Sequence, residues 1–529
     1  MPDKKIAWLP DLLYVAGRLE SGLALVGDAS GIIAGIARAD ELRDEKRVRL
    51  WRRALLPGMI NAHSHAFQRV LRGRTEYRTG STSFSGELPP AESGGSPTRN
   101  EVSARDSFWT WRERMYSAAT RLAPEDVYDA SRMAFLEMAL SGITAVGEFH
   151  YLHNAPEGTS YDDSNLLAKE VMHAAGEVGL RIALLRVAYA RSGFQTEPNP
   201  KQARFVESSA DAYLRNLEGL IASVSRGSVA QDSEALADDR ANTPQAAWVG
   251  VAPHSVRAVP LDYLREVIAY ANENDLKTHM HVAEQPAEVS ACIEEYGRTP
   301  IALLESEALL SERFTAVHAI HVTPKAIPSF AKSGAMVCAC PTTERNLGDG
   351  VVPADEYFKH GVPVCLGTDS HVQIDLLEDV RELEYHLRLQ KLERAVLESR
   401  NPTVRESATS FVHDPDASQR NSTLPDGRVS AVARRLFDCA TINGARSIGS
   451  PGGALEMGMP ADFFTVDLDD PSIAGASKDD LLTSIVFTLS RAAVREVVIG
   501  GKPIVSEGQH LIQEEVVERF NQLQKKLWS

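Results

Sequence analysis

The sequence is poor in cysteine and carries more acidic than basic residues. Its 529 residues include five cysteines, and 72 Asp and Glu oppose 56 Lys and Arg, for a formal net charge of −16 at pH 7. An odd, sparse set of cysteines without a C-x-x-C pair argues against a disulfide framework and is typical of a reducing compartment. Nucleic acids and anionic membranes select basic surfaces, so this charge balance disfavours both as partners.

Long apolar runs are also missing. No stretch of about 18 apolar residues indicates a transmembrane helix, and the first twenty residues lack the continuous apolar segment of a signal peptide. We therefore expect a cytoplasmic protein that does not enter a membrane. No G-x-G-x-x-G motif follows the first strand-like run, so nothing supports a dinucleotide-binding sheet.

What the sequence does contain is a series of short apolar runs of the kind that form β-strands. There are eight of them, at residues 55–65, 142–151, 181–190, 248–255, 276–284, 314–321, 334–341 and 361–370. Amphipathic helical patterns such as 124–142 and 261–274 separate several of the runs. Eight strands alternating with helices predict an α/β fold, a (β/α)8 TIM-like barrel spanning residues 55–452. A doubly wound open sheet is the competing architecture.

The two ends of the chain differ from its centre. Residues 1–54 and 453–510 hold short β-like pieces joined by Gly and Asp turns, and we expect them to pair into one small β-sandwich module. We expect residues 511–529 to form a C-terminal helix. Stretches near 79–104, 222–246 and 399–428 are rich in small, polar or charged residues with weak periodicity, which indicates insertions or loops.

Histidines and carboxylates recur where the predicted strands end. His63 and His65 close the first run, and in a strand residues i and i+2 face the same side. Later runs end on similar residues, namely His281, Glu284, His318 and Asp369. One H-x-H pair is weak evidence by itself, but strand ends of a barrel meet at one mouth. The pattern therefore predicts a single metal site, because imidazole and carboxylate ligands suit zinc or iron.

These strand-end residues resemble the amidohydrolase superfamily, which has H-x-H on strand one, histidines on strands five and six, and aspartate on strand eight. Longer motifs resemble the formimidoylglutamate deiminase branch: HSHAFQR, DSFWTWRERMY, GEFHYLHN, GVAPHSVRAV, THMHVAEQ, AVHAIHVTP, CPTTERNLGDG and GTDSHV. The resemblance runs from the first strand to the eighth and skips the three insertion-like stretches. The long motifs are far more specific than the H-x-H pair.

The resemblance implies a set of metal ligands and proton-transfer groups. One divalent ion, usually zinc, would be bound by His63, His65, His281 and Asp369, and such an ion lowers the pKa of a bound water. The fourth run has no lysine to bridge two metals, which favours one ion. Glu284 is implied as the proton-transfer residue, with a typical contribution of about 10²–10⁴-fold. His318, in preference to His321, would polarise the water, and Asp369 would also hold a proton.

The resemblance further implies that N-formimidoyl-L-glutamate is hydrolysed to N-formyl-L-glutamate and ammonia. Its two carboxylates require arginines, whose guanidinium fork matches a carboxylate. The implied substrate-binding residues are Gln68, Arg112, Tyr151, His254 and Arg257. The insertion near 79–104 adjoins this set, so a deaminase acting on an aromatic base, or on another formimidoyl amino acid, is the alternative. The resemblance also implies a homodimer. A non-catalytic barrel that only binds partners is disfavoured, because such a protein would be expected to have lost metal ligands, whereas all four are present here.

Overall fold

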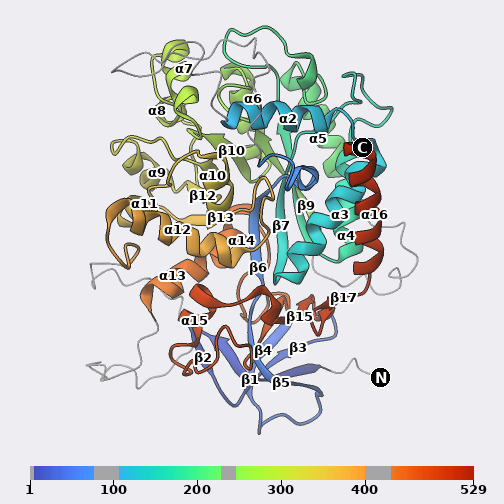
Figure 1. Cartoon of the computed structure of the whole chain (residues 1–529), viewed down its shortest axis with the longest axis vertical. Coiled ribbons are helices and arrows are strands. Elements are labelled where there is room, and N and C mark those ends of the chain that lie inside the picture. The colour runs from blue at the N-terminus through green and yellow to red at the C-terminus, as the bar shows by residue number, and fades with distance from the viewer. Residues whose placement is uncertain (1–4, 77–106, 228–245, 399–429) are drawn as a thin grey trace.

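The structure is a computed structural model, and it describes residues 5–76, 107–227, 246–398 and 430–529. The insertions predicted near 79–104 and 399–428, and most of the one near 222–246, lie outside these ranges. The strands of the described residues form one eight-stranded and one nine-stranded sheet. Figure 1 shows the eight-stranded sheet with its helices in the upper part of the view and the nine-stranded sheet below.

The eight-stranded sheet is the predicted barrel. Its strands follow one another in chain order and every neighbouring pair is parallel. They are β6 (Met59–Ser64), β7 (Ile143–His150), β8 (Arg181–Ala188), β9 (Ala247–Pro253), β10 (Thr278–Val282), β11 (Phe314–His318), β12 (Met336–Ala339) and β13 (Val364–Leu366). The ring closes through a bridge between Ser64 and Asp369. The barrel prediction is confirmed, and the doubly wound alternative is wrong.

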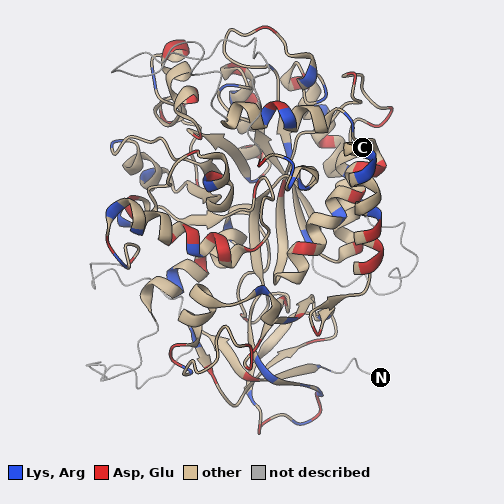
Figure 2. Ribbon diagram, in the orientation of Figure 1, with Lys and Arg blue, Asp and Glu red and all other residues tan. Residues whose placement is uncertain are grey.

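Helices cover the outside of the barrel, which explains why β7 and β8 are buried at every position. The helical elements used below are η1 (Ala66–Leu71), α2 (Phe108–Ala119), α3 (Pro124–Leu140), η2 (Pro200–Gln202), α6 (Leu261–Glu273), α10 (Pro341–Leu347) and α16 (Gln513–Trp528). The amphipathic patterns at 124–142 and 261–274 form α3 and α6. Figure 2 shows charged residues concentrated on the outer helices and loops, whereas the barrel strands carry few. Burial therefore follows the apolar pattern of the sequence.

The nine-stranded sheet combines both ends of the chain, as predicted. It contains β1 (Ile6–Val15), β2 (Arg18–Glu20), β3 (Leu23–Gly27), β4 (Ile33–Arg38), β5 (Lys46–Pro57), β14 (Phe463–Asp467), β15 (Val494–Ile499), β16 (Lys502–Ser506) and β17 (Gln509–His510). The two ends meet where β14 pairs antiparallel with β5. Residues 55–57 of the first predicted run belong to β5, so the first barrel strand begins four residues later than the pattern suggested.

A buried ion pair joins the barrel to the nine-stranded sheet. Arg181, at the start of β8, donates from Nε to Oδ2 of Asp462 at 2.6 Å and from Nη2 to Oδ1 at 3.0 Å. The N–H of Gly500 also donates to Asp462 Oδ1, at 2.6 Å. Both charges are therefore buried with their partners, the arrangement in which a buried charge is tolerated.

The C-terminal helix α16 packs along the outside of the barrel beside α3 (Figure 1). Lys526 pairs with Asp126 at 2.6 Å and Arg519 with Asp129 at 2.9 Å, which fixes the helix against α3. Within the described residues, no helix combines the length and the apolar character needed to cross a membrane.

Candidate active site

Five of the predicted side chains meet at the mouth of the barrel. His63 and His65 lie at the end of β6, His281 on β10, His318 at the end of β11, and Asp369 just beyond β13. Each is buried, with an exposed fraction of 6% or less. Residues that are far apart in sequence converge here because parallel barrel strands all end on the same face.

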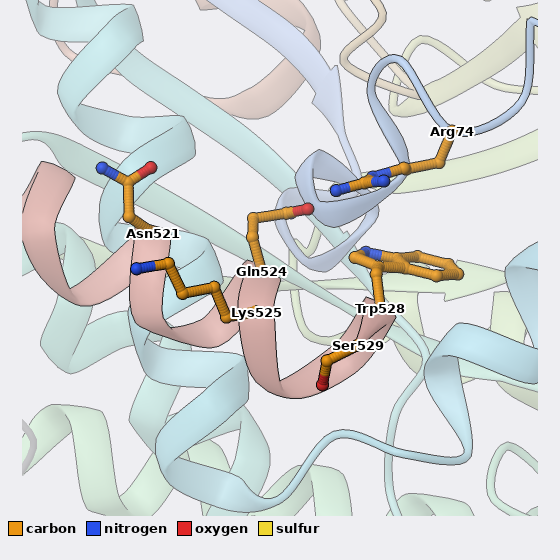
Figure 3. A pocket seen from close by; sticks show the side chains of 6 residues that line it. All are labelled: Arg74, Asn521, Gln524, Lys525, Trp528 and Ser529. Atoms are coloured by element: carbon orange, nitrogen blue, oxygen red, sulfur yellow. The ribbon is translucent and has the colours of Figure 1, made fainter.

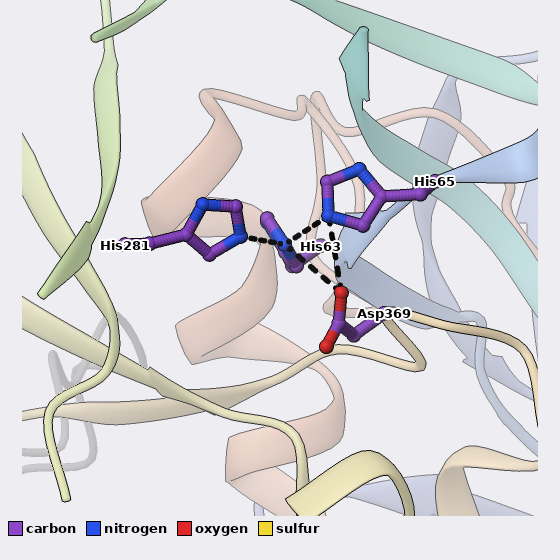
Figure 4. Close-up of side chains that lie close together, drawn as sticks. All are labelled: His63, His65, His281 and Asp369. Carbon is purple, nitrogen blue, oxygen red and sulfur yellow. Dashed lines mark hydrogen bonds and ion pairs between the residues drawn. The ribbon is translucent and has the colours of Figure 1, made fainter. Parts of the chain in front are cut away.

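Four of these residues form a compact group with the composition of a metal site (Figure 4). The Nε2 atom of His63 lies 3.2 Å from Nε2 of His65 and 3.1 Å from Nε2 of His281. Oδ1 of Asp369 lies 3.1 Å from Nε2 of His65 and 3.5 Å from Nε2 of His63. Tetrahedral ligands of zinc, with bonds near 2.0–2.1 Å, lie roughly 3.3 Å apart. The spacing therefore fits one small divalent cation.

The protonation of the histidines supports the same conclusion. Burial lowers the pKa of His63 to about 3 and holds that of His281 well below its usual value, so both imidazoles are neutral. His65 donates its Nδ1 proton to the carbonyl of Phe149 at 2.9 Å, which leaves a lone pair on Nε2. Facing lone pairs repel unless a proton or a cation is shared between them, and one proton cannot serve three nitrogens. A metal ion satisfies all three at once.

Glycine is required next to the first ligand. A Cβ atom on Gly367 would lie 2.5 Å from Cβ of His63 and 2.8 Å from its carbonyl oxygen. The strand that precedes Asp369 can therefore approach β6 only because position 367 has no side chain. This close approach brings Asp369 within hydrogen-bonding distance of the His63 backbone, at 3.1 Å.

Several residues at the mouth have positive φ angles, which non-glycine residues rarely adopt. They are Ala283 (52°), His318 (67°), Ala319 (49°), Asp369 (45°) and His371 (59°). Such conformations cost on the order of 1–3 kcal/mol each and concentrate at functional sites. The backbone thus has unusual conformations at the ends of β10, β11 and β13, close to the predicted ligands and proton-transfer groups.

Glu284 and His318 lie together beside the metal group. Nε2 of His318 is 3.6 Å from Oε1 of Glu284 and 3.8 Å from Oδ2 of Asp369. On its other side, His318 Nδ1 donates to Oε1 of Glu344, on α10, at 3.3 Å. Burial lowers the pKa of His318, but Glu284 and the other carboxylates outweigh it and raise the pKa to about 10. Burial also raises the pKa of Glu284, which favours exchange of a proton.

Glu148, on β7, supports the turn that carries the two first-strand histidines. Its carboxylate accepts hydrogen bonds from Ser64 Oγ at 2.5 Å and from the N–H of Ala66 at 2.7 Å. Burial raises its pKa to about 7. Ser64 also lies 3.0 Å from Nε2 of His371. Sequence analysis missed Glu148, although a carboxylate within an otherwise apolar strand was an available signal.

The predicted substrate-binding residues line one pocket that opens above the metal group. The pocket is lined by His65, Gln68, Phe108, Trp111, Arg112, Met115, Tyr116, Tyr151, Tyr189, Phe205, His254, Arg257, His281, Glu284, His318, Leu347 and Asp369. All five predicted residues are among them. Gln68, on η1, donates from Nε2 to the Tyr151 hydroxyl at 2.7 Å, so these two side chains orient each other.

The two arginines of the pocket have donors without acceptors. Nε and Nη1 of Arg112, on α2, and Nη1 of Arg257 are buried and have no hydrogen-bond partner among the described residues. Burial lowers the pKa of Arg112, because a guanidinium removed from water is costly when it has no counter-ion. The pocket therefore has donors suited to an anion.

Sequence analysis did not single out Tyr116, Tyr189 and Glu344, although the quoted motifs contain Tyr116 and Glu344. Their roles depend on which loops meet above the barrel, and no periodic pattern encodes this. The histidine that competed with His318, His321, turns away and hydrogen-bonds the carbonyl of Asp349 at 2.8 Å. His279, two residues before His281, lies deeper and contacts Ser447.

A second hollow lies on the surface beside α16 and shares no lining residue with the pocket at the barrel mouth. Its lining residues are Arg74, Asn521, Gln524, Lys525, Trp528 and Ser529. Figure 3 shows Arg74 facing Trp528, whose ring centroid lies 5.8 Å from the guanidinium carbon. Neither of the two possible metal-ligand groups among the described residues includes these side chains. The hollow is therefore not a candidate metal site.

Comparison with known proteins agrees with this site. The model of the Amidohydrolase family matches residues 54–504. The chain belongs to this family. It is therefore a hydrolase of the amidohydrolase superfamily, and its four-residue group at the barrel mouth is a metal-binding group.

Individual relatives differ in what they act on. The chain is 34% identical over 471 residues to formimidoylglutamate deiminase of Pseudomonas aeruginosa, covering 89% of this chain and 88% of the relative. It is 26% identical over 479 residues to 5-methylthioadenosine/S-adenosylhomocysteine deaminase of Halobacterium salinarum, covering 89% and 86%. Among solved structures, an amidohydrolase from Brucella melitensis superposes with a TM-score of 0.79 at 29% identity, covering 99% of this chain and 100% of the other.

A more distant structure shares the fold alone. An adenosine deaminase from Xanthomonas campestris with bound zinc superposes with a TM-score of 0.71 at 20% identity, covering 99% of this chain and 98% of the other.

Proposed function

We propose that the enzyme hydrolyses N-formimidoyl-L-glutamate to N-formyl-L-glutamate and ammonia, using one divalent ion, which we take to be zinc. The observation that carries the proposal is the combination of a four-ligand metal group and two arginines with buried, unpartnered N–H groups in one pocket. The ligand set of three imidazoles and one carboxylate suits a divalent ion such as zinc, and such an ion would activate a water taken up as an additional ligand. Of the relatives described above, the one with the highest sequence identity, 34%, is a formimidoylglutamate deiminase.

The reaction replaces the terminal nitrogen of the formimidoyl group by the oxygen of water. A divalent ion bound by His63, His65, His281 and Asp369 would make that water nucleophilic at neutral pH. Glu284 takes a proton from the water and delivers it to the departing nitrogen. The oxygen–carbon bond forms, the bond from carbon to the terminal nitrogen breaks, and ammonia leaves.

The remaining groups position the substrate and stabilise charge. His318 donates toward the reacting centre as negative charge develops there, and Asp369 holds a proton during the attack. Arg112 and Arg257 bind the two carboxylates, while Gln68, Tyr151 and His254 fix the orientation of the substrate. Preorganised donors of this kind accelerate the step only where they bind the reacting state better than the substrate.

A deaminase acting on an aromatic base is the second candidate. The observation in its favour is the aromatic lining of the pocket, which includes Phe108, Trp111, Tyr151 and Phe205. A neutral base, however, leaves the N–H groups of Arg112 and Arg257 without acceptors, which is costly in a buried site. A substrate with two carboxylates would therefore provide acceptors for more of the buried N–H groups in the pocket.

The direct test is ammonia release by the zinc-loaded enzyme from a panel of substrates. The panel contains N-formimidoyl-L-glutamate, N-formimidoylglycine, 5-methylthioadenosine, S-adenosylhomocysteine and guanine. We expect kcat/KM for N-formimidoyl-L-glutamate to exceed that for any base by on the order of 10²-fold or more, because the base leaves buried donors unpaired. A preference for a nucleoside or a base would refute the proposal.

A further inference from the structure

A buried hydrogen-bond network lies at the side of the pocket that is formed by α2. Gln202, at the end of η2, donates from Nε2 to the Tyr116 hydroxyl at 2.6 Å and to the Tyr189 hydroxyl at 2.8 Å. The exposed fractions of Gln202, Tyr116 and Tyr189 are 1%, 3% and 1%. Both tyrosines line the substrate pocket, whereas Gln202 lies behind them.

Counting hydrogens shows that this network has one donor left over. The amide of Gln202 uses both of its hydrogens on the two phenol oxygens, and a hydroxyl has one hydrogen and two acceptor positions. Tyr189 and Tyr116 also hydrogen-bond each other. Of the two phenol hydrogens, one therefore joins the phenols and the other has no recorded acceptor among the described residues. Oε1 of Gln202, on the far side of the same amide, is also without a recorded partner there.

We assign the remaining hydrogen to Tyr116, because Tyr116 is the phenol on the helix that carries Arg112, whose guanidinium carbon lies 5.5 Å from its ring centroid. Tyr189 is then the donor between the two phenols. The Tyr116 oxygen then accepts from both Gln202 and Tyr189, which fills its two acceptor positions. Its own hydrogen must point elsewhere, and no side chain or carbonyl in the described part of the chain is recorded as its acceptor.

The surroundings of Tyr116 are suited to a carboxylate. Arg112 lies one helical turn earlier on α2, and its guanidinium carbon is 5.5 Å from the centroid of the Tyr116 ring. Arg112 and Arg257 bury N–H groups that have no partner among the described residues. Hydroxyl and guanidinium donors gathered in one buried place select a negatively charged acceptor.

The backbone that carries Gln202 is held rigidly in place. Arg186, on β8, pairs with Glu207 through bonds of 2.5 and 2.9 Å, and the N–H of Glu207 donates to the carbonyl of Tyr189 at 2.8 Å. The segment from Gln202 to Glu207 is therefore tied to the strand that leads into Tyr189. A rigid support of this kind is what an oriented donor requires.

We propose that Tyr116 donates its hydroxyl hydrogen to the substrate carboxylate farther from the reacting carbon, and so determines specificity for a dicarboxylate. Gln202 and Tyr189 are positioning residues that fix the direction of this donor. The inference rests on the proposed function, which names Arg112 and Arg257 but gives no role to these three residues.

The first test compares substrates with and without the second carboxylate. In Tyr116→Phe we expect KM for N-formimidoyl-L-glutamate to rise roughly 10- to 30-fold, as for loss of a hydrogen bond to a charged group. KM for N-formimidoyl-L-glutamine should rise only a few-fold, because a hydrogen bond to a neutral amide oxygen is weaker than one to a carboxylate. Equal changes for both substrates would overturn the proposal.

A matched control removes a different buried phenol hydroxyl. The Tyr213 hydroxyl donates to the carbonyl of Arg186 at 2.7 Å and does not line the pocket. Tyr213→Phe should therefore leave the ratio of the two KM values as in the parent enzyme. If Tyr213→Phe shifts the ratio as Tyr116→Phe does, the change reports general loosening, and the assignment to Tyr116 is wrong.

The second test asks whether Gln202 acts through Tyr116. Gln202→Met should raise KM for N-formimidoyl-L-glutamate about fivefold, because the phenols lose their fixed orientation. Adding Gln202→Met to Tyr116→Phe should change nothing further, since coupled residues are not additive. Effects that multiply in the double variant would show that Gln202 acts independently.

Ligand binding separates failure of this inference from failure of the proposed function. Calorimetry on the zinc-loaded protein compares N-formyl-L-glutamate with N-formyl-L-glutamine, and zinc content and melting temperature show that each variant is folded. If the parent enzyme hydrolyses no formimidoyl substrate, the proposed function fails. The inference still stands if the parent binds N-formyl-L-glutamate about tenfold more tightly than N-formyl-L-glutamine and Tyr116→Phe removes that difference. If the parent binds the two ligands equally, the inference is refuted.

Discussion

Two pairs of arginines differ in whether their buried N–H groups have acceptors. Arg181 is paired with Asp462 and Arg186 with Glu207, at closest distances of 2.6 and 2.5 Å. Arg112 and Arg257, at the mouth, bury N–H groups that have no partner among the described residues. Burying a charge without a partner is costly, so it persists where a ligand supplies the partner. The paired arginines join elements of the fold, and the unpaired N–H groups lie in the pocket that we propose for the substrate.

The ligand nitrogens extend the same comparison to neutral groups. His279, deep in the barrel, lies 3.2 Å from the carbonyl of Ser447, whereas Nε2 of His63 faces the Nε2 atoms of two other histidines. The protein satisfies Nε2 of the deeper imidazole. A cation would satisfy the facing Nε2 atoms at the mouth.

The largest effect should follow loss of the proton carrier at the mouth. Glu284→Gln keeps the size of the side chain but cannot accept a proton, so kcat should fall by about 10²–10⁴-fold. Zinc content and the free energy of unfolding should stay as in the parent, because Glu284 is not among the four ligands. Steady-state ammonia release and metal analysis check both expectations, and a near-normal kcat would exclude Glu284 as the proton carrier.

Removing the ion pair between the barrel and the terminal sheet should lower the free energy of unfolding and leave substrate specificity unchanged. Arg181→Met leaves Asp462 buried without its partner, which typically destabilises by about 3–5 kcal/mol. Arg38→Met is the matched control, because Arg38 and Asp40 form an exposed pair, with side chains 67% and 71% exposed, worth roughly 0–1 kcal/mol. Denaturant unfolding measures both variants, and an equal loss in the two would contradict the structural role of the buried ion pair.

The second paired arginine gives a prediction about pH. Burial opposes ionisation of Glu207, but His153 and Arg186 outweigh it and lower its pKa from the ordinary value of 4.5 to about 2. A depressed carboxyl pKa stabilises the fold above pH 4.5, and this contribution disappears as pH falls toward 2. At neutral pH it amounts to about 3 kcal/mol. Urea unfolding of the parent and Glu207→Gln should differ most near pH 7 and converge at low pH; a difference independent of pH would contradict the assignment.

Arg257, in the pocket, should behave differently from the paired arginines. Arg257→Met removes a guanidinium whose Nη1 has no partner among the described residues. Burial lowers the pKa of Arg257, but neighbouring groups that include Glu288 and Glu284 outweigh it and raise the pKa. The free energy of unfolding should therefore fall, but less than in Arg181→Met. KM for N-formimidoyl-L-glutamate should rise roughly 10- to 30-fold, as expected when a charged hydrogen bond is lost, and KM for a monocarboxylate analogue should rise far less. Changes of equal size for both substrates would show that Arg257 does not bind a carboxylate.

The barrel could be predicted because its strands leave a direct trace in the sequence. A strand such as β8 is buried on both faces and therefore appears as a continuous apolar run. The exact start of the first strand could not be seen, since Leu55–Pro57 are as apolar as Met59–Ile60 but pair with β14 in the other sheet. Only the pairing, and not the local pattern, separates the two.

The candidate metal ligands were visible for a similar reason, because the two-residue spacing of His63 and His65 matches the period of a strand. The network around Tyr116 was not visible. Gln202 and Tyr116 are 86 residues apart, and each lies on a helix or loop whose position depends on the whole barrel. A spacing rule finds residues on one element but does not find those that meet only through the fold.

A crystal structure of the zinc-loaded enzyme with N-formyl-L-glutamate would test the central claim most directly. We predict one ion bound by His63, His65, His281 and Asp369, with both carboxylates of the ligand on Arg112 and Arg257. An ion bound elsewhere, or a ligand whose carboxylates face solvent while the arginines stay unpaired, would contradict the account.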